Sequence, residues 1–131
     1  MIGSLYHGSK FAVEGLSEAL HYELEPFGAK VKIVEPGMIA TDFGGRSLEV
    51  SNDESMVEYQ GVVRALFAGM EPMMANASPP SVVAEVIYTA ATDGTDRLRY
   101  PAGADAVEMM AARSALDDAT LIAGFKEQMG L

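Results

Sequence analysis

Cysteine is absent from this chain of 131 residues. Without cysteine there can be no disulfide scaffold, no thiol nucleophile and no thiolate metal site. The absence also fits a protein of a reducing compartment, where disulfides are rare.

Positive charge is scarce as well. Nine lysines and arginines face nineteen aspartates and glutamates, which gives a formal net charge of −10. Such a chain repels phosphate backbones and anionic lipid headgroups, so we expect neither a nucleic-acid partner nor a membrane partner. Long apolar runs are missing too, since none approaches the ~18 residues of a membrane span. The start, Met1 to Tyr6, lacks the basic and apolar regions of a signal peptide, so a cytoplasmic location is the default expectation.

What the chain does have is an ordinary globular composition. Hydrophobic residues make up 49% and charged residues 21%, which argues against disorder. The length predicts one small domain or a piece of a larger one.

The first strong pattern predicts a helix from about Leu5 to Leu24. Polar residues at helical spacing form one stripe: Lys10, Glu14, Ser17, Glu18, His21 and Glu25. The opposite apolar arc is wider than one interface usually needs, with a row formed by Val13, Leu16, Leu20 and Leu24. We therefore expect this helix to pack on a sheet and on a further surface, with Glu14 and Glu18 in solvent. Pro26 and Gly28 predict its end.

Two short strands and four more helices complete the pattern. Strands are predicted at 31–34, which is rich in β-branched residues, and at 97–100, where Arg97 and Arg99 would be exposed on an edge. A loop is expected over 41–53 and a helix over 54–70 that stops near Pro72. The later helices are expected at 79–93, 105–116 and 117–129. The sequence predicts their starts at an N-cap on Ser78 with Pro79 in the first turn, at a capping box of Asp105 with Glu108, and at Asp117.

The order of these elements indicates the fold class. Helices alternate with strands, which is typical of a parallel α/β arrangement.

One pair of residues suggests chemistry. Tyr6 and Lys10 are four residues apart, so their side chains lie one turn apart on the same helix face. A phenol is a weak acid at neutral pH, but a nearby ammonium stabilises the phenolate. The pair could then exchange a proton with a substrate oxygen. As a bare spacing it is much more often two surface residues on a helix.

The surrounding residues strengthen the chemical interpretation. The stretch YHGSKFAVEGLSEAL at 6–20 closely resembles the active-site helix of the short-chain dehydrogenase/reductase family. The stretch VKIVEPGMIATDF at 31–43 resembles the strand and Pro-Gly turn that follow that helix in the family. The resemblance covers nearly the whole chain and implies the C-terminal half of a Rossmann-type doubly wound parallel sheet, with about two strands and several helices.

The resemblance also implies roles for individual residues. Tyr6 resembles the catalytic acid/base, and Lys10 the residue that stabilises its phenolate and binds the ribose of NAD or NADP. Pro36 and Gly37 resemble the turn beside the nicotinamide. The backbone of Ile39 would contact the carboxamide, and the hydroxyl of Thr41 would contact the carboxamide or the pyrophosphate. The segment 42–77 would be the substrate-binding region, and the substrate a small carbonyl or alcohol. No metal is implied.

Parts of the family pattern are missing from the chain. It contains no G-x-x-x-G-x-G or G-x-G-x-x-G turn for the cofactor pyrophosphate, and only five residues precede Tyr6, so the family's catalytic serine has no counterpart. We therefore expect an incomplete domain that is inactive alone. It could be a fragment, part of a longer gene, or a chain that forms a homo-oligomer or pairs with a missing half. The alternative is a non-enzymatic oligomerisation module derived from the family.

Other conspicuous residues favour structural interpretations. His7 and His21 are not spaced as a metal pair. The methionines of the expected substrate region, Met56, Met70, Met73 and Met74, could line an adaptable apolar pocket or fill an irregular core.

Overall fold

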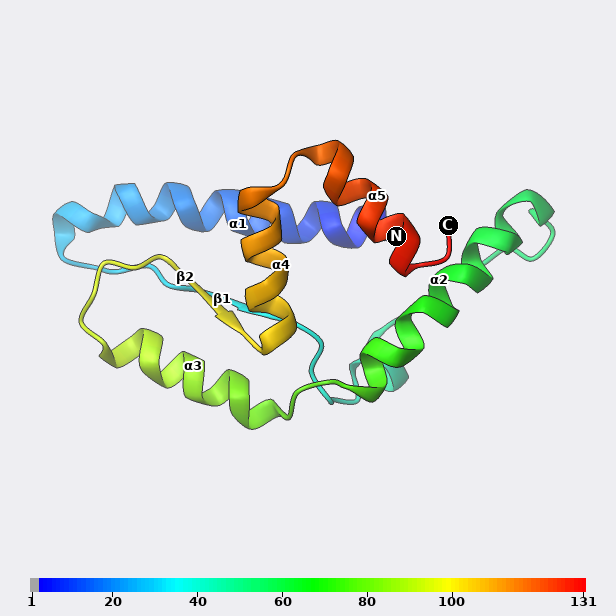
Figure 1. The fold of residues 1–131 in the computed structure, drawn as a ribbon. Helices are drawn as coiled ribbons and strands as arrows, with labels where there is room; N and C mark the ends of the chain where they lie inside the picture. Colours follow the sequence, from blue (N-terminus) through cyan, green and yellow to red (C-terminus); the bar gives the residue numbers. More distant parts are fainter. Residues whose placement is uncertain (1–2) are drawn as a thin grey trace.

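The computed structural model describes residues 3–131 as a mixed α/β chain, in which two short strands lie among five α-helices (Figure 1). In chain order the elements are α1 (Ser4–Leu24), η1 (Glu25–Phe27), β1 (Ile33–Pro36), η2 (Phe43–Ser47), α2 (Val57–Ala75), α3 (Pro80–Thr92), β2 (Arg99–Ala102), α4 (Ala104–Ala115) and α5 (Asp118–Gln128). Among residues 3–131, no helix is both long and apolar enough to cross a membrane.

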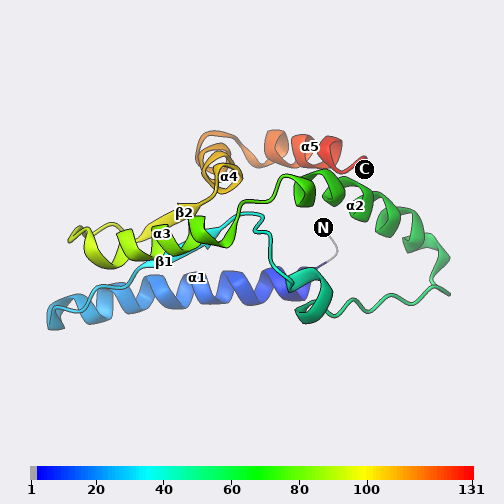
Figure 2. The same ribbon diagram turned by 90° about the horizontal axis from the view of Figure 1, so that it is seen from below.

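The strands form a parallel pair. Ile33 lies opposite Arg99, and Pro36 lies opposite Ala102. The pair lies between α1 and α3, while α2 and α5 extend beyond the end of the sheet (Figures 1 and 2). This confirms the predicted class, a partial α/β domain with a two-stranded parallel sheet.

Each strand lies two residues later than predicted and contains a proline. In a parallel pair only alternate residues of a strand bond the partner. The backbone bonds from Ile33 to Leu98 and from Gly37 to Ala102 place Pro36 and Pro101 at the non-bonding positions. Proline is tolerated there because its missing N–H is not needed.

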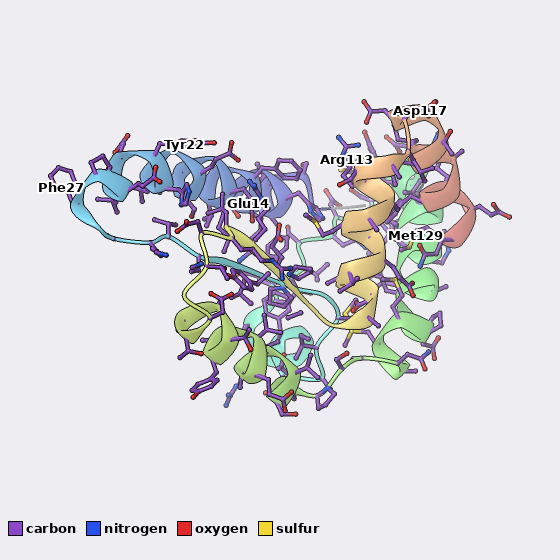
Figure 3. The ribbon with its side chains drawn as sticks, turned by 60° about the vertical axis from the view of Figure 1, so that its left-hand side comes forward. Glu14, Tyr22, Phe27, Arg113, Asp117 and Met129 are labelled. Carbon is purple, nitrogen blue, oxygen red and sulfur yellow. The ribbon has the colours of Figure 1, made fainter. Side chains whose placement is uncertain are left out.

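The buried core is small and has two centres. Around the sheet, the buried side chains come from both strands and from the helices α3 and α4: Ile33, Ala90, Tyr100, Ala102 and Ala106. Away from the sheet, Leu66 of α2 and Met129 are buried. Met129 follows the end of α5 and lies beside α2 (Figure 3). A Cβ on Gly69 would lie 2.9 Å from the Met129 sulfur, so this glycine permits the close approach of α5 to α2.

The helix α1 is oriented differently from the prediction. None of its residues is buried, and its apolar arc faces outward, with Leu16 62% exposed and Phe11 76% exposed. Its polar stripe faces β2, where the Arg99 guanidinium contacts Glu18 Oε2 at 2.6 Å and Glu14 Oε2 at 3.3 Å. Glu14, Glu18 and Arg99, which were expected to be solvated, are partly exposed but joined in ion pairs.

Electrostatics explains this orientation. Arg99 also lies 3.9 Å from Glu35 of β1, so three carboxylates converge on one guanidinium, which is the side chain best suited to bind several of them at once. One oxygen of Glu35, Oε2, is buried and has no hydrogen-bond partner. Burial, and then the nearby Glu14, raise the pKa of Glu35 above its usual value, although Arg99 opposes them.

Several helix boundaries also differ from the predictions. α2 continues past Pro72 to Ala75, because Asn76 bonds the Pro72 carbonyl through both its backbone (3.3 Å) and its side chain (2.8 Å). Ser78 is not an N-cap, since α3 begins at Pro80 with Pro79 as the cap. The expected loop 41–53 contains the π-helical turn η2.

The two remaining predicted helix starts have opposite outcomes. The carboxylate of Asp117 accepts the Thr120 N–H at 2.7 Å, which confirms its place at the start of α5. The predicted capping box of Asp105 with Glu108 is wrong. The N-cap of α4 is Gly103, and no side chain caps this helix, because the Asp105 carboxylate bonds a different segment, as described below.

Candidate functional site

Tyr6 and Lys10 lie in the first two turns of α1, on one face of the helix. The Lys10 ammonium is 5.4 Å from the centre of the Tyr6 ring. Tyr6 is 45% exposed and Lys10 is exposed, so a substrate could reach the phenol. The predicted juxtaposition of a phenol and an ammonium is therefore present in the structure.

Aromatic neighbours limit where the phenol can move. Phe43 lies 6.2 Å from Tyr6, measured between ring centres, and His7 packs edge-on against Tyr6 at 5.6 Å. The Ser9 hydroxyl donates to the Tyr6 carbonyl at 2.7 Å and so serves the helix backbone. Phe43 brings the start of the region 42–77 next to the candidate acid/base.

The turn after β1 borders a shallow apolar groove of about 390 Å³. Pro36, Ile39 and Thr41 form one wall, and α3 forms the other with Pro80, Val83, Ala84 and Ile87. Of the four residues predicted for this turn, Gly37 alone does not line the groove; it lies beneath the carboxylate of Asp105.

Hydrogen bonds from both sides hold this turn. The Met38 N–H donates to Asp105 Oδ2 at 2.6 Å, and the Met38 carbonyl accepts from the Ser78 N–H at 2.9 Å. The Ala40 N–H donates to the Ser78 carbonyl at 2.9 Å. Among the described residues, the Ile39 N–H and the Thr41 hydroxyl donate to no other group. Both donors belong to residues that line the groove.

These residues fit the nicotinamide end of a dinucleotide. An apolar wall can receive the face of an aromatic ring, and a free N–H with a hydroxyl can bind a carboxamide. Pro36, Ile39 and Thr41 would form this part of the site. Among residues 3–131, no hydrogen bond joins the turn to Tyr6 or Lys10. Phe43 connects the turn to the Tyr6–Lys10 pair, because it follows Thr41 by two residues and its ring lies next to that of Tyr6.

The methionines divide between the two interpretations. Met73 lines a second groove of about 440 Å³ together with Met38 and Asp105, whereas Met56 and Met74 are 44% and 42% exposed.

Sequence reasoning missed three residues of this region. The sequence predicts Phe43 only as part of a loop and of the general substrate-binding region, Ser78 as a helix cap, and Asp105 as part of a capping box. The available signal was the pair of glycines, Gly37 and Gly103, since a glycine often marks a place where another group approaches the backbone closely. Nothing in the sequence links either glycine to Asp105.

Comparison with known proteins agrees with these features. The family model for short chain dehydrogenases matches residues 1–52. Two uncharacterized oxidoreductases of Schizosaccharomyces pombe are each 47% identical over 130 residues, which is 99% of this chain and 54% of each relative. An oxidoreductase of Botryotinia fuckeliana is 34% identical over 106 residues, covering 80% of this chain and 38% of the relative.

The parallel strand pair, the Tyr6–Lys10 helix and these matches identify the class of protein. The chain belongs to the short-chain dehydrogenase/reductase family. It spans about half the length of the Schizosaccharomyces pombe oxidoreductases that it matches.

Proposed function

We propose that this chain supplies the acid–base and nicotinamide-facing half of an oxidoreductase site that acts on a carbonyl or alcohol carbon. The observation that carries the proposal is the Tyr6–Lys10 pair, with its ammonium 5.4 Å from an accessible phenol ring. The groove bordered by Pro36, Ile39 and Thr41 supports it as a place for the cofactor. NAD or NADP, when bound, would supply or accept the hydride.

The residues of the chain would then manage the proton and the orientation of the reactants. In reduction, the Tyr6 hydroxyl gives its proton to the carbonyl oxygen; in oxidation, the phenolate takes the hydroxyl proton. The Lys10 ammonium stabilises the phenolate and reaches toward the ribose. Ile39 and Thr41 hold the carboxamide, and Phe43 excludes water from one side of Tyr6.

The isolated 131-residue chain is expected to have negligible turnover. The Tyr6–Lys10 pair and the turn are present, but the chain contains no glycine-rich turn to bind the cofactor pyrophosphate. A test must therefore supply that part. We would join residues 1–131 to the segment of the Schizosaccharomyces pombe relative that this chain does not match, and call the product the hybrid enzyme.

The hybrid enzyme would be assayed by the absorbance of NADH and of NADPH against a panel of aldehydes and ketones. We expect turnover, and a loss of about 100-fold or more in Tyr6→Phe, as is typical for removal of a general acid. Tyr22→Phe, on the same helix and 64% exposed, is the matched control and should keep full activity. Equal activity of Tyr6→Phe and Tyr22→Phe would refute the assigned role of Tyr6.

A second candidate function is a non-enzymatic interaction module, either a homo-oligomer or a partner of a missing half. The outward apolar arc of α1, with Phe11 76% and Leu16 62% exposed, favours it. This function predicts an assembly that persists in Tyr6→Phe and Lys10→Ala, measured by size exclusion with light scattering. A hybrid enzyme without turnover, together with such an assembly, would favour the module.

A further inference from the structure

The first turn of α4 contacts the turn that follows β1. Asp105 is the second residue of α4, in the first helical turn, where the helix dipole favours a carboxylate. Its Oδ2 accepts the N–H of Met38 at 2.6 Å, across 67 residues of sequence. The side chain therefore joins the start of α4 to the turn after β1.

Two glycines make room for this carboxylate. A Cβ added to Gly37 would overlap both oxygens of Asp105, and a Cβ added to Gly103 would lie 2.7 Å from Oδ1. Gly103 also has a φ of 107°, which side chains with a Cβ rarely adopt. The Asp105 carboxylate therefore fits between positions 37 and 103 because both residues are glycine.

The position of this contact relates it to the groove. The Asp105 carboxylate accepts the N–H of Met38, and the N–H of Ser78 donates to the carbonyl of Met38. Both backbone groups of Met38 are then satisfied by protein. The next residue, Ile39, lines the groove, and among the described residues its N–H donates to no other group. The contact at Met38 therefore restrains the backbone that carries the Ile39 N–H.

We propose that Asp105 is a positioning residue that holds the turn 36–41 in the conformation that binds the nicotinamide end of the cofactor. This inference rests on the proposed function and deepens it, because it makes the β2–α4 unit responsible for the orientation of the cofactor. Asp105 itself touches neither cofactor nor substrate. It acts through the backbone of Met38 and Ile39.

The structural part of the test uses the 131-residue chain and needs no cofactor. Amide hydrogen exchange of the segment 37–41, measured by mass spectrometry, should be about tenfold or more faster in Asp105→Ala. Asp105→Asn should stay within about threefold of wild type, because its amide oxygen can still accept the Met38 N–H. Asp117→Ala is the matched control, since Asp117 likewise accepts a backbone N–H at the start of a helix, at 2.7 Å.

A double-mutant cycle tests the close approach itself. Gly37→Ala should lower the folding equilibrium constant at least about fivefold in the wild-type background, as overpacking does. In the Asp105→Ala background the same substitution should cost less than about twofold, because the oxygens that it would overlap are gone. Equal costs in the two backgrounds would overturn the contact. The exchange measurement remains decisive where a variant is too unstable for the cycle.

The functional part uses the hybrid enzyme and separates positioning from stability. Asp105→Ala should raise the KM for NADH or NADPH about tenfold or more, with kcat at saturating cofactor within about threefold of wild type. Asp105→Asn should restore the KM, and Asp117→Ala should leave it unchanged. A KM in Asp105→Ala equal to that of Asp117→Ala would overturn the proposal while leaving the proposed function intact. A wild-type hybrid without turnover or cofactor binding would overturn the proposed function, and with it the role of Asp105 toward the cofactor.

Discussion

The surface of the chain predicts that it self-associates when purified alone. Its accessible area is 9385 Å² for a mass of 13.9 kDa. A compact monomer of that mass exposes about 6,700 Å², so the excess is about 2,700 Å². A standard interface buries only ~800 Å² per partner. The excess is therefore several times what a stable dimer needs, and the chain should form dimers or larger assemblies at micromolar concentration.

The outward side of α1 is the place to test this prediction. Phe11 and Tyr22 are 76% and 64% exposed and are eleven residues apart, which places them on the same helix face. Burying such a side chain contributes ~1.5–3 kcal/mol. Each change to serine should therefore raise the dissociation constant at least about tenfold. Tyr88→Ser on α3, 71% exposed, is the matched control and should leave association unchanged.

Light scattering over a dilution series would measure these dissociation constants. A wild-type chain that remains a monodisperse, cooperatively unfolding monomer at micromolar concentration would refute the reasoning. The reasoning would also be refuted if Tyr88→Ser weakened association as much as the α1 variants do, because the assembly would then not depend on α1.

Three further predictions concern the polar contacts around the sheet. Arg99→Met should lower the free energy of unfolding by only about 1 kcal/mol, because the ion pairs of Arg99 with Glu18 and the other glutamates are partly exposed to solvent. Urea titrations at high salt should show a smaller loss, because salt screens these ion pairs. The Tyr100 hydroxyl donates to Asp93 at 2.7 Å and is the main cause of the lowered pKa of Asp93. Tyr100→Phe removes this hydroxyl. The variant should therefore lose a smaller part of its stability than wild type as the pH falls through the pKa of Asp93 in the folded chain. The pKa of Glu35 is instead raised in the folded chain, so its ionisation destabilises the fold as the pH rises. Glu35→Gln should therefore be more stable than wild type at pH 7, with a difference that vanishes below about pH 4, where the unfolded carboxyl is also protonated; an equal difference at both pH values would contradict the assignment.

Much of the fold could be predicted because it depends on local patterns. The helical period of 5–24 and the β-branched run at 31–34 indicated the right kinds of element, and Gly28 and Gly94 lie just beyond helical segments with φ of 74° and 69°. The boundaries were less predictable, because the partner strand decides which residues bond. Pro36 and Pro101 lie within strands only because the register places them at non-bonding positions.

In the candidate site, too, local spacing was predictable from the sequence and long-range contacts were not. The Tyr6–Lys10 juxtaposition follows from helical spacing alone, so the sequence predicted it. The orientation of α1 did not follow, because a hydrophobic pattern cannot anticipate that Arg99, 81 residues after Glu18, attracts the polar stripe. The role of Asp105 was likewise hidden, since its partner Met38 lies 67 residues away.

The packing of Asp105 against Gly37 has a consequence for how related sequences can diverge. A methyl group at position 37 and a carboxylate at position 105 exclude each other in this geometry, so we expect the two positions to vary together among homologues. A homologue that places alanine at the position of Gly37 should carry glycine, alanine or serine at that of Asp105, and should obtain the hydrogen bond for its Met38 counterpart from elsewhere. An alignment of family members could count such pairs, and frequent alanine beside a retained aspartate would contradict the coupling.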